Sequence, residues 1–351
     1  MKNAKRLSAV LLGSILFIAG ILKLMDPVGT GLVMQAYLRF LHMGFLYAIA
    51  YPSGIIAGLC ETILGAALIT GIQRKISAIA SLVILSFFTV LTLFILILNP
   101  EMDCGCFGEF IKLTHAQSFW KNIFLLALWG VAFIPLKAQE PTRKIRKVVF
   151  PIVVISVILF ALYSALSLPL VDFTIMKPGN ELLAYEELDM PSDATVLHFS
   201  DVTGQDADTL AVEGRVMTVS IYNPGEISAA SWDNISETVS NAQRAGYTTL
   251  VLTASTPAEM ESITSSPDIL TNLYFADRKA LMTLNRSNGG ATYIADGMII
   301  SKWSVHKAPD YNKMEELMNT NITEAMITEN NSKRLQLQAF LLYLFAIMLL
   351  L

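Results

Sequence analysis

The segment Ile76–Phe110 reads ISAIASLVILSFFTVLTLFILIL and then NPEMDCGCFGEF. Residues 76–98 carry no charged side chain, and as a helix rising 1.5 Å per residue they are long enough to cross the hydrocarbon core of a bilayer. The apolar run stops at Asn99–Pro100, and a Cys-Gly-Cys sequence follows within a few residues. The sequence therefore predicts a membrane span that ends beside a pair of cysteines, Cys104 and Cys106.

The whole chain has the composition of an integral membrane protein. Its 351 residues are 54% hydrophobic and only 15% charged, whereas soluble domains carry about 25% charged residues. Apolar runs near the length of a span recur, and the first is kept as a helix because no small-residue cleavage site closes it as in a signal peptide. The predicted spans are 7–25, 51–70, 76–98, 118–136, 148–168 and 335–351. The last run is the shortest, and the sequence leaves open whether it spans fully.

Charge is distributed unevenly along the chain and predicts an orientation. The formal net charge is +8 for residues 1–168 and −12 for residues 169–351. The sequence shows no clustered basic face, so it does not indicate nucleic-acid binding. Ten basic residues fall at the amino end and in the loops on one side of the predicted spans: Lys2, Lys5, Arg6, Arg74, Lys75, Lys137, Arg143, Lys144, Arg146 and Lys147. Positive loops stay in the cytoplasm, so we expect Cys104, Cys106 and residues 169–334 to face outward.

The cysteine pair suggests redox chemistry. Outside the cytoplasm disulfides persist, and the Cα atoms of a Cys-Gly-Cys sequence are at most about 7 Å apart, just within reach of a disulfide. Gly105 allows backbone dihedrals that other residues avoid, and a strained, exposed disulfide has the higher reduction potential of labile bridges. Half of a metal site and an inert structural bridge are the alternatives. The first lacks a complete ligand set, and the second would remove little chain entropy.

Three further residues stand out in the first two spans. Cys60, in AGLCETILG, is interpreted as a small buried hydrophobe. Glu61 beside it would place a carboxylate near the middle of the membrane, where such groups are functional or paired. Lys23 at the outer end of the first span is the expected partner, and we expect the two side chains to meet beneath the Cys104–Cys106 loop. A structural ion pair and a proton-handling site remain alternatives.

Three motifs in this order resemble one membrane-protein family. They are FIAGILKLMDPVG in the first span, CETILGAALI in the second and DCGCFG after the third. Together they resemble the DoxX-like membrane proteins, and the cysteine motif is similar to the MauE branch, the methylamine utilisation protein. The resemblance covers about residues 6–136. It implies a four-helix membrane bundle that takes part in periplasmic thiol–disulfide chemistry, with Lys23, Glu61, Cys104 and Cys106 at the matching positions.

The pattern after the fifth span is that of a soluble α/β domain. RVMTVSIYN, YTTLVLTAS and NLYFAD predict strands separated by helices, and NGGATYIADGMIISKWS predicts a hairpin that turns at Asp296–Gly297. This order resembles the thioredoxin-like fold. The domain departs from that family because YNPGEISAAS stands where a Cys-Xaa-Xaa-Cys would follow the first strand, and residues 107–351 contain no cysteine.

The predicted organisation is an α-helical membrane protein with an attached α/β thioredoxin-like domain. Its expected parts are a four-helix bundle (1–140), a fifth span (141–170), a cysteine-free periplasmic domain (171–332) and a C-terminal span (333–351). The predicted function is thiol–disulfide exchange in a bacterial inner membrane between a periplasmic thiol protein and the pair Cys104 and Cys106, supported by Gly105, Glu61, Lys23 and Asp103. A quinone is a candidate electron acceptor, although no quinone site is identified. The alternative is a non-enzymatic membrane scaffold or assembly factor.

Overall fold

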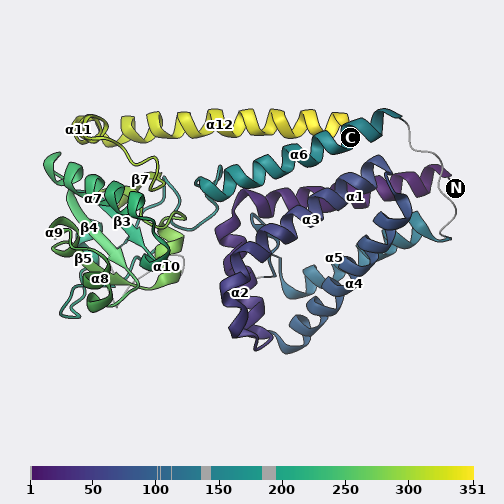
Figure 1. Cartoon of the computed structure of the whole chain (residues 1–351), viewed down its shortest axis with the longest axis horizontal. Coiled ribbons are helices and arrows are strands. Elements are labelled where there is room, and N and C mark those ends of the chain that lie inside the picture. Colours follow the sequence, from purple (N-terminus) through teal and green to yellow (C-terminus); the bar gives the residue numbers. More distant parts are fainter. Residues whose placement is uncertain (1, 101, 103, 112, 136–143, 184–194) are drawn as a thin grey trace. The chain divides into compact units, whose positions relative to one another are not determined.

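The computed structural model describes residues 2–100, 102, 104–111, 113–135, 144–183 and 195–351. The chain divides into two compact units (Figure 1). The membrane unit comprises Met1–Val171 and Ala339–Leu351, and the sheet unit comprises Asp172–Gln338. The last helix, α12 (Ile322–Leu350), contributes residues to both units.

The membrane unit is almost entirely helical. Its elements in chain order are α1 (Lys2–Met25), α2 (Pro27–Phe40), the 3-10 helix η1 (Gly44–Ile49), α3 (Ala50–Thr70), α4 (Arg74–Leu98), the short strand β1 (Cys106–Glu109), α5 (His115–Phe133) and α6 (Lys144–Leu166). Helix α1 packs along α3, and α4 packs along α5 (Figure 1).

Local sequence signals set the ends of these helices. Asp26 caps α2 by accepting a hydrogen bond from the Gly29 backbone N–H at 2.9 Å, and Pro27 occupies the first helical position, where its missing N–H costs nothing. Thr114 forms a capping box with Gln117 at the start of α5. The corner at Asp26–Pro27 turns the chain from α1 into α2, which packs on α3 and contacts β1 next to the cysteine loop.

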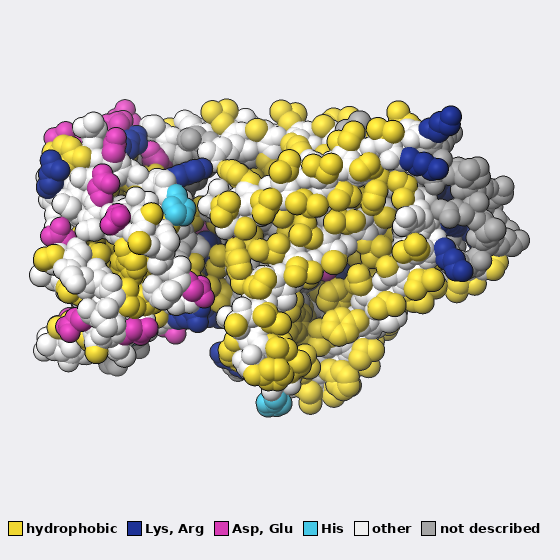
Figure 2. Space-filling model, in the orientation of Figure 1, with side chains coloured by type: hydrophobic (Ala, Val, Ile, Leu, Met, Phe, Trp, Pro, Cys, Tyr) yellow, Lys and Arg dark blue, Asp and Glu magenta, His cyan; other side chains and the backbone are white. Residues whose placement is uncertain are grey.

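Four helical segments are long and apolar enough to cross a membrane: Asn3–Met25, Gly44–Thr70, Arg74–Leu98 and Lys144–Leu166. Helix α4 exposes a stripe of large apolar side chains at helical spacing, namely Ile76, Ile79, Val83, Phe87, Val90, Phe94 and Ile97. Hydrophobic side chains also cover most of the visible face of this unit (Figure 2). A soluble protein rarely exposes so large an apolar surface, so the chain is embedded in a membrane.

Four of the six predicted spans correspond to these segments. The predicted spans 118–136 and 335–351 coincide with α5, which ends at Phe133, and with the last part of α12. Both are helices, but neither is among the four segments that meet the length and hydropathy requirements within the described residues. Membrane crossing by these two helices stays a prediction.

The sheet unit is built on a mixed six-stranded sheet. Its strands are β2 (Phe199–Ser200), β3 (Arg215–Ile221), β4 (Thr248–Thr253), β5 (Leu273–Ala276), β6 (Gly290–Ala295) and β7 (Met298–Trp303), in the spatial order β2-β5-β4-β3-β6-β7. Strands β3, β4 and β5 run parallel, and β6 and β7 form an antiparallel hairpin. Asp296 and Gly297, with φ of 46° and 78°, make the predicted turn of that hairpin.

Helices cover both faces of the sheet. They are α7 (Ala229–Arg244), α8 (Pro257–Ile263), α9 (Pro267–Leu270), α10 (Arg278–Leu284) and α11 (Tyr311–Asn319), with short 3-10 turns η2 (Asp208–Ala211) and η3 (Pro224–Glu226). Successive side chains of β3 point to opposite faces of the sheet. Val216 on one face clusters with Leu281 of α10, and Val219 on the other clusters with Ile235 of α7. The predicted layered α/β arrangement is therefore confirmed for these elements.

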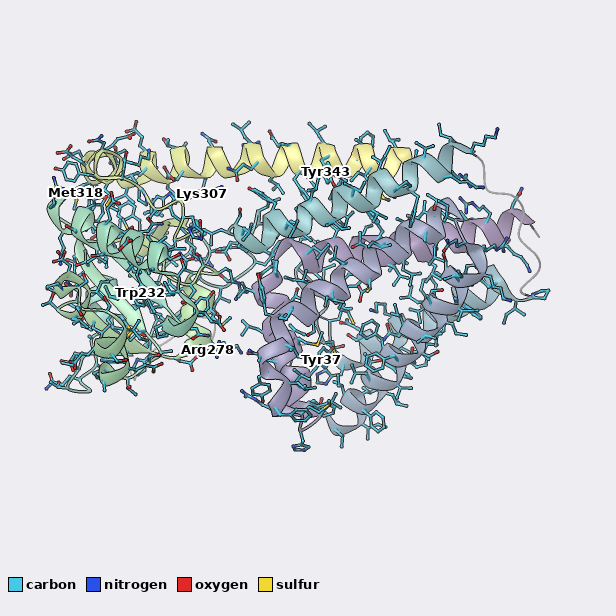
Figure 3. All side chains as sticks on the ribbon, in the orientation of Figure 1. Tyr37, Trp232, Arg278, Lys307, Met318 and Tyr343 are labelled. Atoms are coloured by element: carbon cyan, nitrogen blue, oxygen red, sulfur yellow. The ribbon has the colours of Figure 1, made fainter. Side chains whose placement is uncertain are left out.

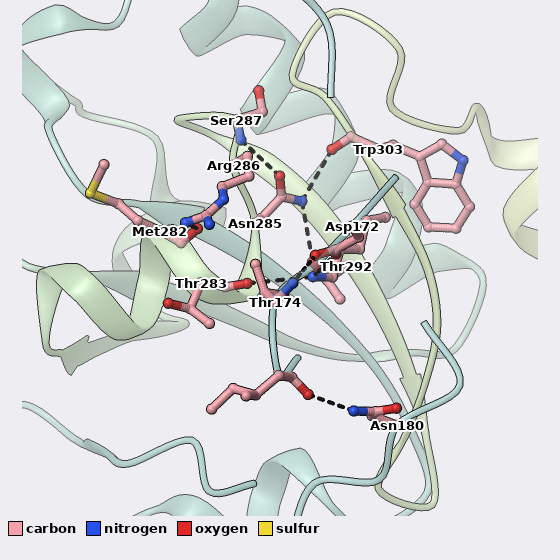
Figure 4. Close-up of polar contacts among 12 residues, drawn as sticks. Asp172, Thr174, Asn180, Met282, Thr283, Asn285, Arg286, Ser287, Thr292 and Trp303 are labelled. Atoms are coloured by element: carbon pink, nitrogen blue, oxygen red, sulfur yellow. Dashed lines mark hydrogen bonds and ion pairs between the residues drawn. The ribbon is translucent and has the colours of Figure 1, made fainter. Parts of the chain in front are cut away.

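A buried polar network ties the start of the sheet unit to its last strands (Figure 4). Lys302 Nζ on β7 lies 2.6 Å from Asp172 Oδ2, and the Asn285 amide donates to the carbonyl oxygens of Ala291 and Trp303 at 2.9 and 3.2 Å. Burial alone would raise the pKa of Asp172, but the Lys302 ammonium outweighs it and holds that pKa below its ordinary value. Asp172 is therefore ionised at neutral pH and fixes the beginning of this unit.

Candidate functional site

A seam of glycines brings helices α1 and α3 into close contact. Gly13 and Gly20 on α1 meet Gly58 and Gly65 on α3, and the members of each pair are seven residues apart, so they lie on one face of their helix. A Cβ atom added at Gly65 would lie 2.5 Å from the Phe17 backbone nitrogen, and one added at Gly20 would lie 2.6 Å from the Gly58 carbonyl oxygen. The two backbones therefore approach more closely than any larger residue would allow.

The predicted contact between Lys23 and Glu61 is confirmed. Lys23 Nζ lies 2.5 Å from Glu61 Oε1 and 2.6 Å from Oε2, and only 8% and 3% of the two residues remain exposed. Lys23 follows Gly20 by three residues and Glu61 follows Gly58 by three, so each charge stands one helical turn beyond a glycine of the seam. The close approach of the backbones lets the lysine side chain reach a carboxylate deep in the second span.

The ion pair lies next to the apolar cluster that holds the cysteines. Lys23 Nζ is 5.6 Å from the centroid of the Phe88 ring, a distance typical of a cation–π contact. Phe88 and Cys106 both pack against the buried cluster that contains Cys104. Strand β1 passes against the end of α1, where a Cβ atom on Gly108 would lie 3.8 Å from the Lys23 Cα atom. The cysteine loop thus borders the buried charges, as predicted.

Two separate features of the structure require a glycine at position 105. Its φ of +55° lies in the left-handed region, where residues with a Cβ are strained. A Cβ atom would also collide with the Val33 side chain of α2. Gly108, with a φ of +61°, donates a backbone hydrogen bond to the Gly105 carbonyl at 3.2 Å and closes a tight turn around Cys106. The backbone freedom expected of Gly105 is confirmed.

The thiols of Cys104 and Cys106 differ in exposure. Cys104 is 3% exposed and packs against Leu91 and Ile95, whereas Cys106 is half-buried at the first position of β1. Phe40 and Phe88 surround the pair, so the thiols sit in a largely apolar setting. Cys106 is therefore the more accessible of the two residues. Asp103, predicted to support the pair, lies outside the described residues.

Tyr37 of α2 is a site residue that the sequence did not single out. Its hydroxyl donates a hydrogen bond to the Cys104 carbonyl oxygen. Burial, followed by the nearby charges of Cys106, Cys104 and Glu61, raises the pKa of the Tyr37 phenol, so the group stays protonated and remains a donor. Tyr37 is half-buried and lies on α2 of the membrane unit (Figure 3). No sequence pattern separates it from the other apolar residues of VMQAYLRF.

The interpretation of Cys60 as a small buried hydrophobe is wrong. Its side chain is exposed on α3, while that of the adjacent Glu61 is buried. Successive residues on a helix point about 100° apart, so burying the carboxylate against α1 turns Cys60 away from the bundle. In a membrane Cys60 therefore faces lipid and is separated from the Cys104–Cys106 loop.

Asn288 fastens the loop that follows β3 in the sheet unit. The Asn288 side-chain oxygen accepts backbone hydrogen bonds from Tyr222 and Asn223 at 3.0 and 3.2 Å, and its amide donates to the Asn223 carbonyl at 2.6 Å. The loop after β3 is thereby fastened to the loop before β6. Residues 107–351 contain no cysteine, so all three thiols of the chain lie in the membrane unit.

Part of the membrane unit is similar in sequence to a known protein family. Residues 1–135 match the family described as methylamine utilisation protein MauE. No curated protein and no solved structure matches the chain. The matched region contains α1 to α5, the Lys23–Glu61 pair and both cysteines of the loop. The first 135 of the 351 residues are therefore similar to the MauE family, and the match covers less than half of the chain.

Proposed function

We propose that the chain catalyses thiol–disulfide exchange through Cys104 and Cys106. The observation that carries this proposal is the arrangement of the two thiols: one is buried and one half-exposed, one residue apart, in a turn fixed by Gly105 beside the ion pair of Lys23 and Glu61. A dithiol with one accessible and one shielded sulfur suits a two-step exchange, because the first sulfur meets the partner and the second resolves the intermediate.

In the oxidising direction, a partner thiolate attacks Cys106 Sγ of a Cys104–Cys106 disulfide. The intramolecular S–S bond breaks, its electron pair stays on the Cys104 sulfur, and that sulfur takes up a proton. A second partner thiolate then attacks the mixed disulfide and releases Cys106. Two electrons and two protons pass from the partner to the pair, and a membrane quinone is the proposed class of acceptor that restores the disulfide. The reverse sequence would reduce a partner disulfide, and the geometry serves both directions.

The buried ion pair and Tyr37 have supporting roles in this proposal. The hydrogen bond from Tyr37 holds the carbonyl of Cys104 and so fixes the shielded sulfur. The Lys23–Glu61 pair is neutral as a whole but polar, and it offers a charged group near the thiols where a thiolate must form in an apolar setting. We propose that it offsets the charge that appears on the sulfur during exchange.

The proposed setting is a bacterial inner membrane with the cysteine loop on the periplasmic side. The excess of basic residues at the opposite helix ends supports this orientation. The MauE match and the packed α1, α3, α4 and α5 support a DoxX-like bundle. Parallel β3 and β4 joined by α7, followed by the antiparallel β6–β7 hairpin, support a thioredoxin-like sheet unit. Such a unit without thiols would contribute docking rather than exchange.

Trapping the mixed disulfide tests this proposal. A Cys104→Ser variant keeps the accessible thiol and removes the resolving one. Its Cys106 thiolate should attack a disulfide of the periplasmic partner and displace one partner thiolate, and the mixed disulfide should accumulate because Cys104 is not there to release it. Non-reducing electrophoresis with mass spectrometry would identify the adduct. Cys60→Ser is the matched control and should behave as wild type. If the Cys104→Ser and Cys106→Ser variants both retain full function in cells, the pair is not catalytic, and the alternative of a membrane scaffold is favoured.

A further inference from the structure

Three arginines converge at one end of the membrane unit. Arg6 of α1 donates to the Leu68 and Ile69 carbonyls at the end of α3, and Arg146 of α6 donates to the neighbouring Thr70 carbonyl at 3.2 Å. Arg74 of α4 donates to the Ala132 carbonyl at the end of α5 at 3.0 Å. The guanidinium of Arg6 lies within electrostatic range of both Arg146 and Arg74. The cluster is thus assembled from three helices over the C-termini of two others.

The positive charge of this cluster exceeds what the helix ends offset. Each helix C-terminus provides roughly half a negative charge, so α3 and α5 together offset about one of the three guanidinium charges. Among the described residues of the membrane unit, the acidic positions are 26, 61 and 109. Positions 26 and 109 adjoin the opposite end of α1, and position 61 lies nine residues before the end of α3. About two positive charges therefore remain uncompensated in the described part of this end.

The arginines also retain hydrogen-bond donors. A guanidinium has about five N–H groups. Among the described residues, Arg6 uses two of them toward the α3 carbonyls, and Arg74 and Arg146 use one each. All three residues are half-buried, so packing restricts their positions while part of each residue stays accessible. Planar forks of this kind bind phosphate oxygens well.

The position of the cluster identifies the ligand as a lipid. Arg6, Arg74 and Arg146 stand within the first turns of three of the four membrane-spanning segments, at the level where phospholipid headgroups lie. Each has an exposed aliphatic neighbour on the same helix: Leu7, Ile76 and Ile145 are 70%, 62% and 69% exposed. Figure 2 shows dark blue side chains at one end of the hydrophobic surface of this unit. A soluble anion would make no use of these apolar side chains.

We propose that this arginine cluster binds the phosphate of an anionic phospholipid, with the acyl chains lying against the aliphatic residues beside it. A lipid carrying two phosphates, such as cardiolipin, matches the excess of about two charges best. The bound headgroup would link α1, α4 and α6 at the ends of α3 and α5. This site is separate from the proposed site of thiol chemistry. Along α1 and α3, about nine residues or more separate the arginine cluster from the ion pair beside the cysteines.

Lipid binding to the full-length chain in a neutral detergent tests the proposal. Native mass spectrometry and thermal unfolding would compare phosphatidylglycerol, cardiolipin and phosphatidylcholine. The test variant is Arg74→Gln/Arg146→Gln, and the control is Lys75→Gln/Lys147→Gln, which removes the same charge from two exposed neighbours. We expect wild type and control to retain anionic lipid, and the arginine variant to lose roughly 30-fold in affinity, from the usual contribution of each basic residue.

Three outcomes would overturn the proposal. The first is equal retention of phosphatidylcholine and the anionic lipids by wild type, a result that stands even if the arginine variant fails to fold. The second is an equal loss of affinity in the lysine control, which would indicate general surface charge. The third is stabilisation of wild type by inorganic phosphate to the same extent as by cardiolipin, which would indicate an anion site without lipid specificity.

Discussion

Separating the buried charges of Lys23 and Glu61 should cost several kcal/mol, and removing both should cost little. The pair is bidentate, at 2.5 and 2.6 Å, and nearly inaccessible. Removing one partner of such a pair typically costs about 3–5 kcal/mol, and an unpaired charge at the centre of a membrane helix costs about 3 kcal/mol on insertion scales. We therefore expect Glu61→Gln and Lys23→Met each to destabilise the chain by about 3 kcal/mol, which is more than a hundredfold in the folding equilibrium.

A double-mutant cycle measures this coupling. The free energy of unfolding would be determined in mild detergent for wild type, both single variants and Lys23→Met/Glu61→Gln. The double variant should recover most of the loss, because no charge is then left unpaired. With about 3 kcal/mol lost in each single variant and about 1 kcal/mol in the double variant, the coupling energy should be about 5 kcal/mol. Exposed ion pairs give about 1 kcal/mol or less. A coupling energy below about 1 kcal/mol would refute the argument that the pair is buried and mutually dependent.

Three further predictions follow from single sites. Gly65→Ala should destabilise the membrane unit by about 1–3 kcal/mol, because the added Cβ atom would collide with the backbone of α1. Gly130→Ala is the control: its added Cβ atom would meet one side-chain atom at 3.8 Å, so the variant should be neutral in the same unfolding assay. Tyr37→Phe should alter the reduction potential of the dithiol, measured by redox titration, while Phe keeps the ring packing. The hydrogen bond to Asp208, and then the charge of Asp208, raises the pKa of His198. This contact therefore stabilises the sheet unit below about pH 6.5, and its contribution is lost as the pH rises through the raised pKa. His198→Gln should flatten that part of the profile of melting temperature against pH.

The sequence predicted those parts of the site that depend on rare residue types in strong patterns. A carboxylate in an apolar run must find a partner, so Glu61 pointed to Lys23, the only basic residue near the outer end of the first span. A Cys-Gly-Cys sequence restricts the backbone, so Gly105 could be expected at a positive φ. In both cases one physical requirement dominated the alternatives, and the structure bears out the contact and the conformation.

Other parts depended on tertiary packing that no local pattern encodes. Tyr37 bonds a carbonyl 67 positions away, and its neighbours in sequence are equally apolar. Cys60 was assigned to the interior because free cysteines are usually buried, but burial of Glu61 fixed the rotation of α3 and turned Cys60 outward. In the sheet unit, strand β2 has only two residues, too few for a period of two to be recognised, and its pairing beside β5 could not be predicted.

The same double variant separates a structural role of the ion pair from a chemical one. A buried pair is weak evidence for stability, because apolar residues of similar volume often replace it without loss. If Lys23 and Glu61 served only to hold α1 against α3, the glycine seam would keep the helices together and Lys23→Met/Glu61→Gln would fold and exchange disulfides normally. If the pair offsets charge on the sulfur, the double variant should fold yet exchange at least about tenfold more slowly, since a loss of 1.4 kcal/mol of transition-state stabilisation is a factor of ten. Stopped-flow measurement of exchange with a small dithiol would decide between the two roles, because an unchanged rate in a stable double variant leaves the pair with no part in the chemistry.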